Sequence, residues 1–281
     1  MTEWFHAAVL GLVQGLTEFL PVSSGAHLRV FSALAGWDDP GAAFTAVTQL
    51  GTETAVLIYF RRDIGAIVKA WTLSLFRAEW RRDQNAKLGW YVIVGTLPIG
   101  IIGKLFQDTI ETTLRDLRLI GTTLIVFGVI LAVADRSRAV RNARPISSLT
   151  FKHALVYGGA QSLALIPGVS RSGGTISAGL FLGYSREAAA RYSFLLAIPA
   201  VLASGGLELL KIGDGPAPAW GPTILATLIA FAVGYAAIAW FLKYISHHSF
   251  TPFVVYRILL GITIIALVTA GTLDPNAGAV H

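Results

Sequence analysis

The sequence is poor in charged residues and contains no cysteine. Only 14% of its 281 residues are charged, whereas 54% are hydrophobic and the mean hydropathy is +0.64. Soluble domains carry about 25% charged residues, so this chain has too little charge to cover a globular surface, and disorder needs the opposite composition. The absence of cysteine excludes disulfides, thiolate metal sites and cysteine nucleophiles. The composition therefore predicts an integral membrane protein.

The charge that is present is mainly basic, with a net charge of +6. On a multi-pass membrane protein, Lys and Arg concentrate in cytoplasmic loops and set the orientation of the chain. We therefore expect no nucleic-acid partner. The first residues lack the basic start of a signal peptide, so we also expect no cleaved leader.

Apolar windows divide the chain into membrane-spanning and interrupted regions. Six windows have the length of roughly 17–25 residues that a helix needs to cross a bilayer; they are 42–60, 88–106, 118–135, 187–210, 221–242 and 252–271. Two more apolar regions, 4–36 and 153–183, are interrupted by proline and polar residues. Unpaired backbone at membrane depth must face protein or a cavity, so these two regions are better explained as re-entrant helix pairs. The sequence predicts an all-α polytopic protein with six crossings and about ten helical segments.

The distribution of charge orients this arrangement. Lys and Arg outnumber acidic residues by seven to three in 61–87 and by five to one in 135–152. The loops near 36–41, 107–115 and 211–220 have no basic excess. The positive-inside rule then predicts that the two basic loops are cytoplasmic and that both termini lie outside the cytoplasm.

The two interrupted regions resemble each other. Residues 11–23 align with 158–170, and each segment carries a glutamine nine residues before a serine. Each half also has an arginine near the beginning of its last predicted helix, Arg118 in the first half and Arg257 in the second, and the segments that follow the two arginines are similar. We therefore expect a single membrane domain over 1–281 that contains repeats 1–140 and 148–281, each with one re-entrant pair and three crossings. An odd number of crossings inverts the second repeat, and inverted repeats place their sites near the midplane.

Gln14 and Glu18 are the first candidate site residues. They lie four residues apart, so a helix places both on one face. A carboxylate at mid-membrane costs roughly 2.5–3.5 kcal/mol and normally faces a cavity or a partner. Glu18 could simply pair with an arginine between helices, but a role in a site is favoured.

A second candidate lies at 167–175, with the sequence Pro-Gly-Val-Ser-Arg-Ser-Gly-Gly-Thr. Small and hydroxyl residues before an apolar run predict a loop that enters a helix N-terminus, which is a natural place for an anion. Arg171 would add a bidentate donor for phosphate oxygens. The predicted phosphate-binding residues are Ser170, Arg171, Ser172, Gly173, Gly174 and Thr175, with Ser23 from the first region.

A third group consists of Ser23, Ser24 and His27. A serine three residues before a histidine suits a nucleophile and its base, although the two serines could instead cap a helix. Gln49 and Glu53 repeat the Gln-x-x-x-Glu spacing inside a predicted crossing. Together with Gln161, they could support the site from neighbouring helices, or Glu53 could tie two helices together.

Residues 15–24 with His27, together with 167–175, resemble the bacterial undecaprenyl-diphosphatase family, also called UppP or BacA. Shorter segments are also similar to that family: Gln49-Leu-Gly51, Tyr59-Phe-Arg-Arg62, Thr96-Leu-Pro98 and Phe253-Val-Val-Tyr-Arg257. The resemblance implies hydrolysis of undecaprenyl diphosphate to undecaprenyl phosphate and phosphate. This reaction recycles the lipid carrier of cell-wall synthesis and is associated with bacitracin resistance.

The resemblance also implies roles for particular residues. Ser24 matches the proposed nucleophile, His27 its base and Arg171 an essential arginine, while Gln14 and Glu18 occupy the family's (Glu/Gln)-x-x-x-Glu motif. Dependence on a divalent cation, Mg²⁺ or Ca²⁺, is implied as well, with Glu18 and Gln14 as candidate ligands. An alternative within this scheme is attack by metal-activated water.

Three departures from the family pattern bear on the metal ligands. Gln14 stands where many members have Glu, Gly25-Ala26 replaces the usual Thr-Gly, and Glu53 stands where an apolar residue is common. The family implies the bacterial inner membrane, a site that opens to the extracytoplasmic side, and a polyprenyl diphosphate lipid as partner; whether the chain forms a homodimer stays open. A lipid-phosphate transporter or flippase is the alternative function, because inverted repeats are also transporter architecture.

Overall fold

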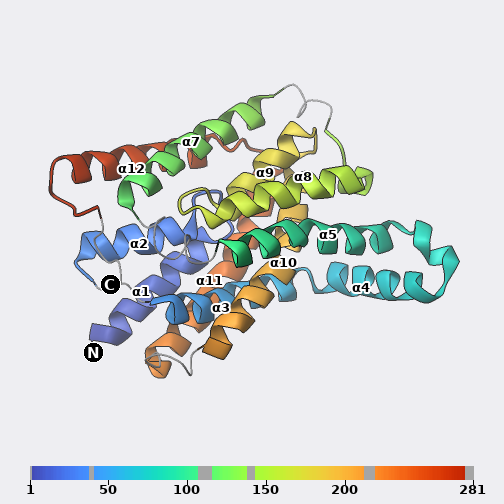
Figure 1. Cartoon of the computed structure of the whole chain (residues 1–281), viewed down its shortest axis with the longest axis horizontal. Helices are drawn as coiled ribbons and strands as arrows, with labels where there is room; N and C mark the ends of the chain where they lie inside the picture. Colours follow the sequence, from blue (N-terminus) through green and yellow to red (C-terminus); the bar gives the residue numbers. More distant parts are fainter. Residues whose placement is uncertain (1, 38–40, 107–115, 138–142, 212–218, 276–281) are drawn as a thin grey trace.

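The protein is a bundle of helices joined by short connections (Figure 1). A computed structural model describes residues 2–37, 41–106, 116–137, 143–211 and 219–275. Within these ranges the only strand-like pairing is an isolated bridge between Arg144 and Tyr184. The elements are, in order, α1 (Thr2–Thr17), α2 (Ser24–Ala35), α3 (Gly41–Tyr59), α4 (Arg61–Phe76), η1 (Ala78–Arg82), α5 (Gln84–Leu105), α7 (Leu117–Arg136), η4 (Ile146–Ser148), α8 (Phe151–Ser162), η5 (Leu163–Leu165), α9 (Arg171–Phe181), α10 (Arg186–Lys211), α11 (Trp220–Ile245) and α12 (Thr251–Thr269). The all-α prediction is confirmed.

Five of the described helices are long and apolar enough to cross a membrane: α5, α7, α10, α11 and α12. They correspond to five of the six predicted crossings. The sixth window, 42–60, does form the 19-residue helix α3, but Gln49, Glu53 and several threonines lower its hydropathy. Of these polar residues, Glu53 borders the site described below.

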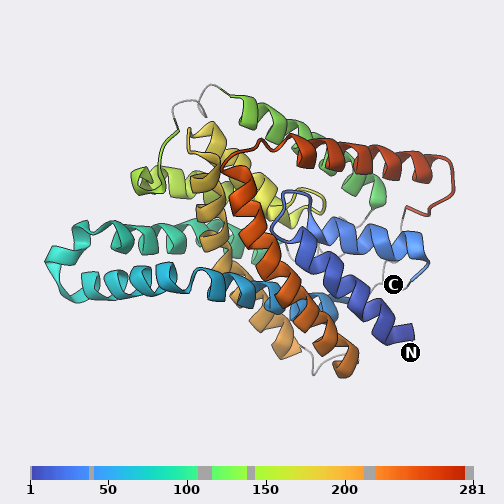
Figure 2. The same cartoon turned by 180° about the vertical axis from the view of Figure 1, so that it is seen from behind.

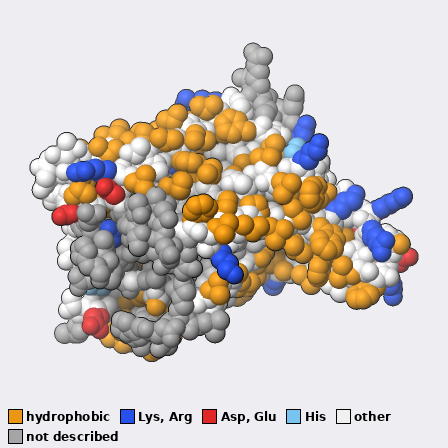
Figure 3. Space-filling model, in the orientation of Figure 1, with side chains coloured by type: hydrophobic (Ala, Val, Ile, Leu, Met, Phe, Trp, Pro, Cys, Tyr) orange, Lys and Arg blue, Asp and Glu red, His pale blue; other side chains and the backbone are white. Residues whose placement is uncertain are grey.

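The outer surface is largely apolar (Figure 3). Large hydrophobic side chains such as Leu105, Phe151 and Leu228 are more than half exposed. Soluble proteins rarely expose contiguous apolar surface on this scale, whereas a lipid-facing surface requires it. The protein is therefore a multi-pass membrane protein.

The two interrupted regions fold as predicted into pairs of short helices. α1 and α2 are joined by the turn at residues 18–23, which we call the first turn. α8, η5 and α9 are joined by the turn at residues 166–170, the second turn. In both Figure 1 and Figure 2 these turns lie inside the bundle rather than at its ends.

The two halves of the chain exchange partners. α1 packs against α11 of the second half, and α8 packs against α5 of the first, while α7 packs against α12 and α3 against α10. Glycines permit the close approach: a Cβ on Gly158 would lie 2.5 Å from the Gly95 carbonyl oxygen, and one on Gly11 would overlap the Ala226 backbone. The inverted repeat stays a prediction, which this exchange supports; its first boundary, residue 140, lies outside the described residues.

The basic segment 61–87 contains more helix than expected. It was predicted as a loop, but it forms α4, η1 and the start of α5, and this helical hairpin projects from the bundle (Figures 1 and 2). Ile67, Ala70 and Ser74 of α4 are buried, and α4 packs against α5. Lys and Arg side chains gather at the hairpin tip (Figure 3). The loops predicted at 107–115, and Asp38-Asp39, lie outside the described residues.

Candidate active site

A single buried carboxylate joins the two turns. Glu18, which follows α1 and is 8% exposed, accepts hydrogen bonds on both of its oxygens. Its Oε1 accepts from Arg171 Nη2 at 2.5 Å, and its Oε2 accepts from Ser24 Oγ at 2.6 Å and from Gln14 Nε2 at 2.9 Å. Four residues that the sequence singled out therefore meet at one point, although they come from segments more than 150 positions apart.

Two serines hold the turns in an uncommon backbone conformation. Ser23 has φ 74° and Ser170 has φ 71°, and they are the non-glycine residues with positive φ in the described part of the chain. Each directly precedes a helix, α2 or α9. Ser170 Oγ accepts a hydrogen bond from the Gly173 amide, whereas the Ser23 side chain caps nothing. Strained backbone of this kind persists only where its surroundings fix it, and it clusters at functional sites.

The hydroxyls at the start of α9 bind protein atoms. Ser172 Oγ donates to the Leu20 carbonyl of the first turn at 3.0 Å. Thr175, which is fully buried, donates to the Arg171 carbonyl and lies 2.6 Å from Ser193 Oγ. In this structure these hydroxyls hold the second turn against its neighbours, and their role as phosphate donors stays a prediction.

The two glycines of that segment are likewise packed. A Cβ on Gly173 would lie 2.9 Å from Arg257 Nη1, and one on Gly174 would lie 3.1 Å from the Ala160 carbonyl oxygen. Both residues are buried. They pack closely against their neighbours in this structure. Arg171 nearby has a buried Nη1 with no hydrogen-bond partner among the described residues.

The sequence predicted His27 as the base for Ser24, but the His27 side chain hydrogen-bonds other residues. Its Nδ1 lies 2.7 Å from the Ser23 carbonyl oxygen and its Nε2 lies 2.8 Å from the Tyr256 hydroxyl. A carbonyl only accepts, so Nδ1 carries the proton and donates to Ser23. The rings of His27 and Tyr256 also stack, with centroids 5.5 Å apart. The structure thus pairs Ser24 with Glu18, and Tyr256 is a contact that no sequence spacing could have revealed.

Glu53 places a second carboxyl group near this centre. It lies on α3, is 2% exposed, and is close enough to Arg171 and Glu18 to interact with their charges. Its Oε1 has no hydrogen-bond partner in the described chain. Gln49, four residues earlier, is only partly buried. Glu53 therefore borders the site instead of tying two helices together with an ion pair.

The buried glutamines leave polar atoms unpaired. Gln14 and Gln161 are both fully buried. Gln14 Oε1 has no partner within the described ranges, and neither do Nε2 and Oε1 of Gln161. Buried polar atoms are almost always paired, so such atoms mark places where water, an ion or a ligand group belongs.

These oxygens bear on the divalent cation that the family resemblance implies. Mg²⁺ and Ca²⁺ prefer carboxylate and amide oxygens. Glu18, the unpaired Oε1 of Glu53 and the unpaired Oε1 of Gln14 supply that donor type. Among the described residues no group of three or more His, Cys, Asp or Glu gathers, so a cation here would keep several waters. The residues fit a hydrated Mg²⁺ better than a closed protein cage.

The fold and this centre define a class: an α-helical multi-pass membrane protein with a buried acidic, hydroxyl and arginine site where two re-entrant turns meet. A family model described as Bacitracin resistance protein BacA matches residues 7–263. The chain belongs to this family.

Curated relatives match the chain over nearly its whole length. Undecaprenyl-diphosphatase 2 of Frankia casuarinae is 64% identical, and Undecaprenyl-diphosphatase 3 of Frankia alni is 62% identical, each over 99% of both chains. Undecaprenyl-diphosphatase 2 of Streptomyces coelicolor is 60% identical over 98% of both chains.

Proposed function

We propose that this chain is an undecaprenyl-diphosphatase, which hydrolyses undecaprenyl diphosphate to undecaprenyl phosphate and inorganic phosphate. The observation that carries the proposal is the Glu18 carboxylate, bound at once to the Ser24 hydroxyl and the Arg171 guanidinium. Full-length relatives that bear this activity as their name support it and favour it over a lipid-phosphate transporter.

The hydrogen bond between Ser24 and Glu18 supports Glu18 as the base. The Ser24 hydroxyl already donates to Glu18 Oε2, so the carboxylate takes this proton as Ser24 Oγ attacks the terminal phosphorus. The P–O bond to the bridging oxygen breaks, and undecaprenyl phosphate leaves with the proton that Glu18 passes to it. Water then attacks the phosphoserine while Glu18, again ionised, removes the water proton; inorganic phosphate leaves, and Glu18 returns the proton to Ser24 Oγ. The rival is direct attack by water on the same phosphorus, with Glu18 again as the base.

Arg171 and the α2 N-terminus bind the phosphate oxygens. Arg171 uses one terminal nitrogen for Glu18, and its unpaired Nη1 donates to the diphosphate. The first amides of α2 have no side-chain cap, because the Ser23 hydroxyl does not fold back onto them. An uncapped N-terminus offers donors and a positive dipole end to developing negative charge. Phosphoryl transfer depends mainly on such positioning and charge stabilisation.

His27 orients the first turn. Its Nδ1 proton binds the carbonyl of Ser23, the strained residue just before Ser24. The bond fixes the direction in which Ser24 leaves the turn. A positioning role for His27 replaces the role of base that the three-residue spacing suggested.

A divalent cation fits beside these residues. Glu18, Gln14 and Glu53 would hold it, and when bound it supplies positive charge to the diphosphate. The protein itself binds the phosphates through Arg171, removes the proton through Glu18 and keeps both groups in place through the two turns.

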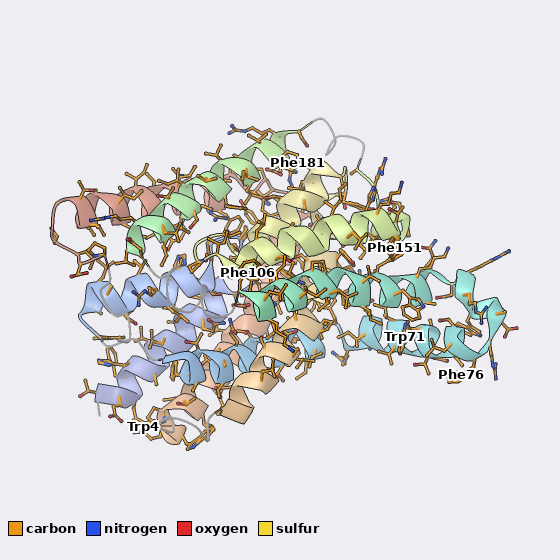
Figure 4. All side chains as sticks on the ribbon, in the orientation of Figure 1. Trp4, Trp71, Phe76, Phe106, Phe151 and Phe181 are labelled. Atoms are coloured by element: carbon orange, nitrogen blue, oxygen red, sulfur yellow. The ribbon has the colours of Figure 1, made fainter. Side chains whose placement is uncertain are left out.

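The expected orientation places the site toward the outside of the bacterial inner membrane. The basic hairpin tip and the start of α1 lie at opposite ends of the molecule, as Phe76 and Trp4 show in Figure 4. Together with the positive-inside rule, this separation supports a cytoplasmic hairpin and extracytoplasmic termini. The polyprenyl diphosphate then enters from the outer leaflet. A homodimer stays a prediction.

Phosphate release from undecaprenyl diphosphate by the purified protein in detergent tests the function. We expect wild type to release phosphate and Ser24→Ala to lose at least about 100-fold in kcat, because the nucleophile or the orientation of the attacking water is lost. Ser32→Ala is the matched control, since Ser32 is buried on the same helix, away from Glu18. A wild-type protein without phosphatase activity, or full activity in Ser24→Ala, contradicts the proposal.

A further inference from the structure

Arg257 is a fully buried cation without an acidic partner. It lies in the second turn of α12 and has 0% exposure. The described part of the chain contains no ion pair between Arg257 and a carboxylate; its partners are four backbone carbonyls. An unpaired charge at membrane depth is costly and usually marks a functional place.

The four hydrogen bonds join three separate segments. Nη1 donates to the Pro21 carbonyl at 3.0 Å, and Nη2 donates to the carbonyls of Gly168 and Val169 at 2.8 and 3.0 Å. Nε donates to the Leu124 carbonyl of α7 at 3.0 Å. One guanidinium therefore binds the first turn, the second turn and α7 together.

The bonded carbonyls occupy equivalent places in the two turns. Pro21 lies two residues before Ser23 and Gly168 two residues before Ser170, the two serines with positive φ. The planar fork of the guanidinium reaches both carbonyls at once, which a compact ammonium group could not do. Buried backbone carbonyls need hydrogen-bond donors, because an unpaired polar group away from water costs free energy.

Two glycines make room for this side chain. A Cβ on Gly128 of α7 would lie 3.1 Å from Arg257 Cγ, and one on Gly173 of α9 would lie 2.9 Å from Arg257 Nη1. The neighbouring Tyr256 hydrogen-bonds His27 of α2. The start of α12 is thus fitted to both turns.

We propose that Arg257 is a positioning residue that sets Glu18 of the first turn and Ser24, which follows that turn, against Arg171, which follows the second turn. The inference rests on the proposed phosphatase function. Ser24 directly follows the strained Ser23, and Arg171 directly follows the strained Ser170, so tying the preceding carbonyls together fixes the distance between nucleophile and phosphate ligand.

The first test is Arg257→Lys. Lysine keeps the charge, so attraction of the diphosphate and hence KM should stay within about 3-fold, whereas kcat should fall about 30- to 100-fold because small displacements of reacting groups cost about this much. Arg118→Lys is the matched control, because Arg118 starts the corresponding helix of the first half and is exposed. An unchanged kcat, or a rise in KM alone, overturns the proposal.

A double substitution separates positioning from mere stability. If Arg257 acts through the placement of Arg171, Arg257→Lys should cost less than about 3-fold in an Arg171→Ala background, since interacting groups are not additive. The same fold loss in both backgrounds contradicts the proposal.

Gly128→Ala gives an independent route should Arg257→Lys fail to fold. The added Cβ displaces the Arg257 stem, so we expect the same loss of kcat with KM retained. Gly121→Ala is its control, because Gly121 faces α12 at Gly261 and Ile265 instead of at Arg257. Equal activity of the two variants overturns the proposal.

A readout without turnover keeps this inference distinct from the proposed function. The chain has no cysteine, so Leu20→Cys with Ser172→Cys reports the contact of the two turns through disulfide formation. We expect oxidation to cross-link this pair quickly, and at least about 10-fold more slowly when Arg257→Lys removes the tie that supplies the effective concentration. Equal cross-linking rates contradict the positioning role, whereas absent phosphatase activity of wild type contradicts only the function.

Discussion

At the scale of single residues, the site depends on which groups share the Glu18 carboxylate. Gln14, Ser24 and Arg171 all bind it, and Glu53 lies within reach of its charge. Gln14, Glu18 and Glu53 each bring side-chain oxygens to this centre. A cation that brings positive charge therefore has a place among the unpaired oxygens described above.

Glu53→Gln tests that place for a cation. The amide keeps the shape of the side chain but removes one charged ligand, so we expect the Mg²⁺ concentration for half-maximal activity to rise about 10-fold, with kcat at saturating Mg²⁺ changed by less than about 3-fold. Phosphate release in Mg²⁺ titrations after chelator treatment measures this shift. The matched control is Gln49→Leu on the same helix, which should leave the titration unchanged. If Glu53→Gln and wild type show the same Mg²⁺ dependence, Glu53 is not a ligand of the cation.

Much of the site is predictable from sequence because polar residues at membrane depth are few. Glu18, Ser24 and Arg171 stand out in an apolar chain, and the structure brings them together. Their pairing is not predictable. The spacing of three residues suggested that His27 is the base for Ser24. The positive φ of Ser23 redirects the chain, however, and the Ser24 hydroxyl donates instead to Glu18 on the other side of the turn.

At the scale of elements, glycines decide how closely the re-entrant helices approach their partners. Gly11 of α1 and Gly158 of α8 occupy equivalent places in the two aligned regions, and each meets the backbone of a helix from the other half. Sequence patterns of small residues predict that a helix packs closely, but they do not predict which helix it packs against. The partner helix depends on the exchange of helices between the two halves, and the periodicity of a single sequence carries no information about that exchange.

Gly158→Ala should weaken the packing of α8 on α5. The new Cβ would lie 2.5 Å from the Gly95 carbonyl oxygen, so the helices must separate. We expect a loss of about 1–3 kcal/mol, visible as a lower thermal unfolding temperature in detergent. Gly159→Ala is the control, because nothing lies within 4 Å of a Cβ at that position. Equal unfolding temperatures for the two variants would show that this contact does not limit stability.

At the scale of the whole molecule, the distribution of charge predicts an orientation. Lys and Arg side chains gather at the tip of the hairpin of α4, η1 and α5, and α1 begins at the opposite end of the molecule (Figures 3 and 4). Hydropathy predicted the all-α type of the chain and the five helices that are long and apolar enough to cross a membrane. Hydropathy did not predict the helical hairpin, because α4 carries three basic residues and Asp63 among its apolar residues, and much of its buried face is formed by packing against α5.

Single cysteines test the orientation, since the chain has none of its own. Asn85 near the hairpin tip and Glu3 at the start of α1 are both exposed. A membrane-impermeant thiol reagent added to intact cells should label Glu3→Cys and spare Asn85→Cys, because the positive-inside rule predicts a cytoplasmic location for the basic hairpin. Permeabilised cells, in which both variants should react, provide the control. The reverse pattern in intact cells would invert the topology.

The most direct test of the central claim is phosphate release from undecaprenyl diphosphate by Glu18→Gln. The substitution keeps the size of the side chain but removes the proton acceptor for Ser24 and the charge that holds Arg171. We predict a fall in kcat of about 10²–10⁴-fold, the usual contribution of a general base, in a protein that still folds. A Glu18→Gln protein that releases phosphate at the wild-type rate would contradict the account.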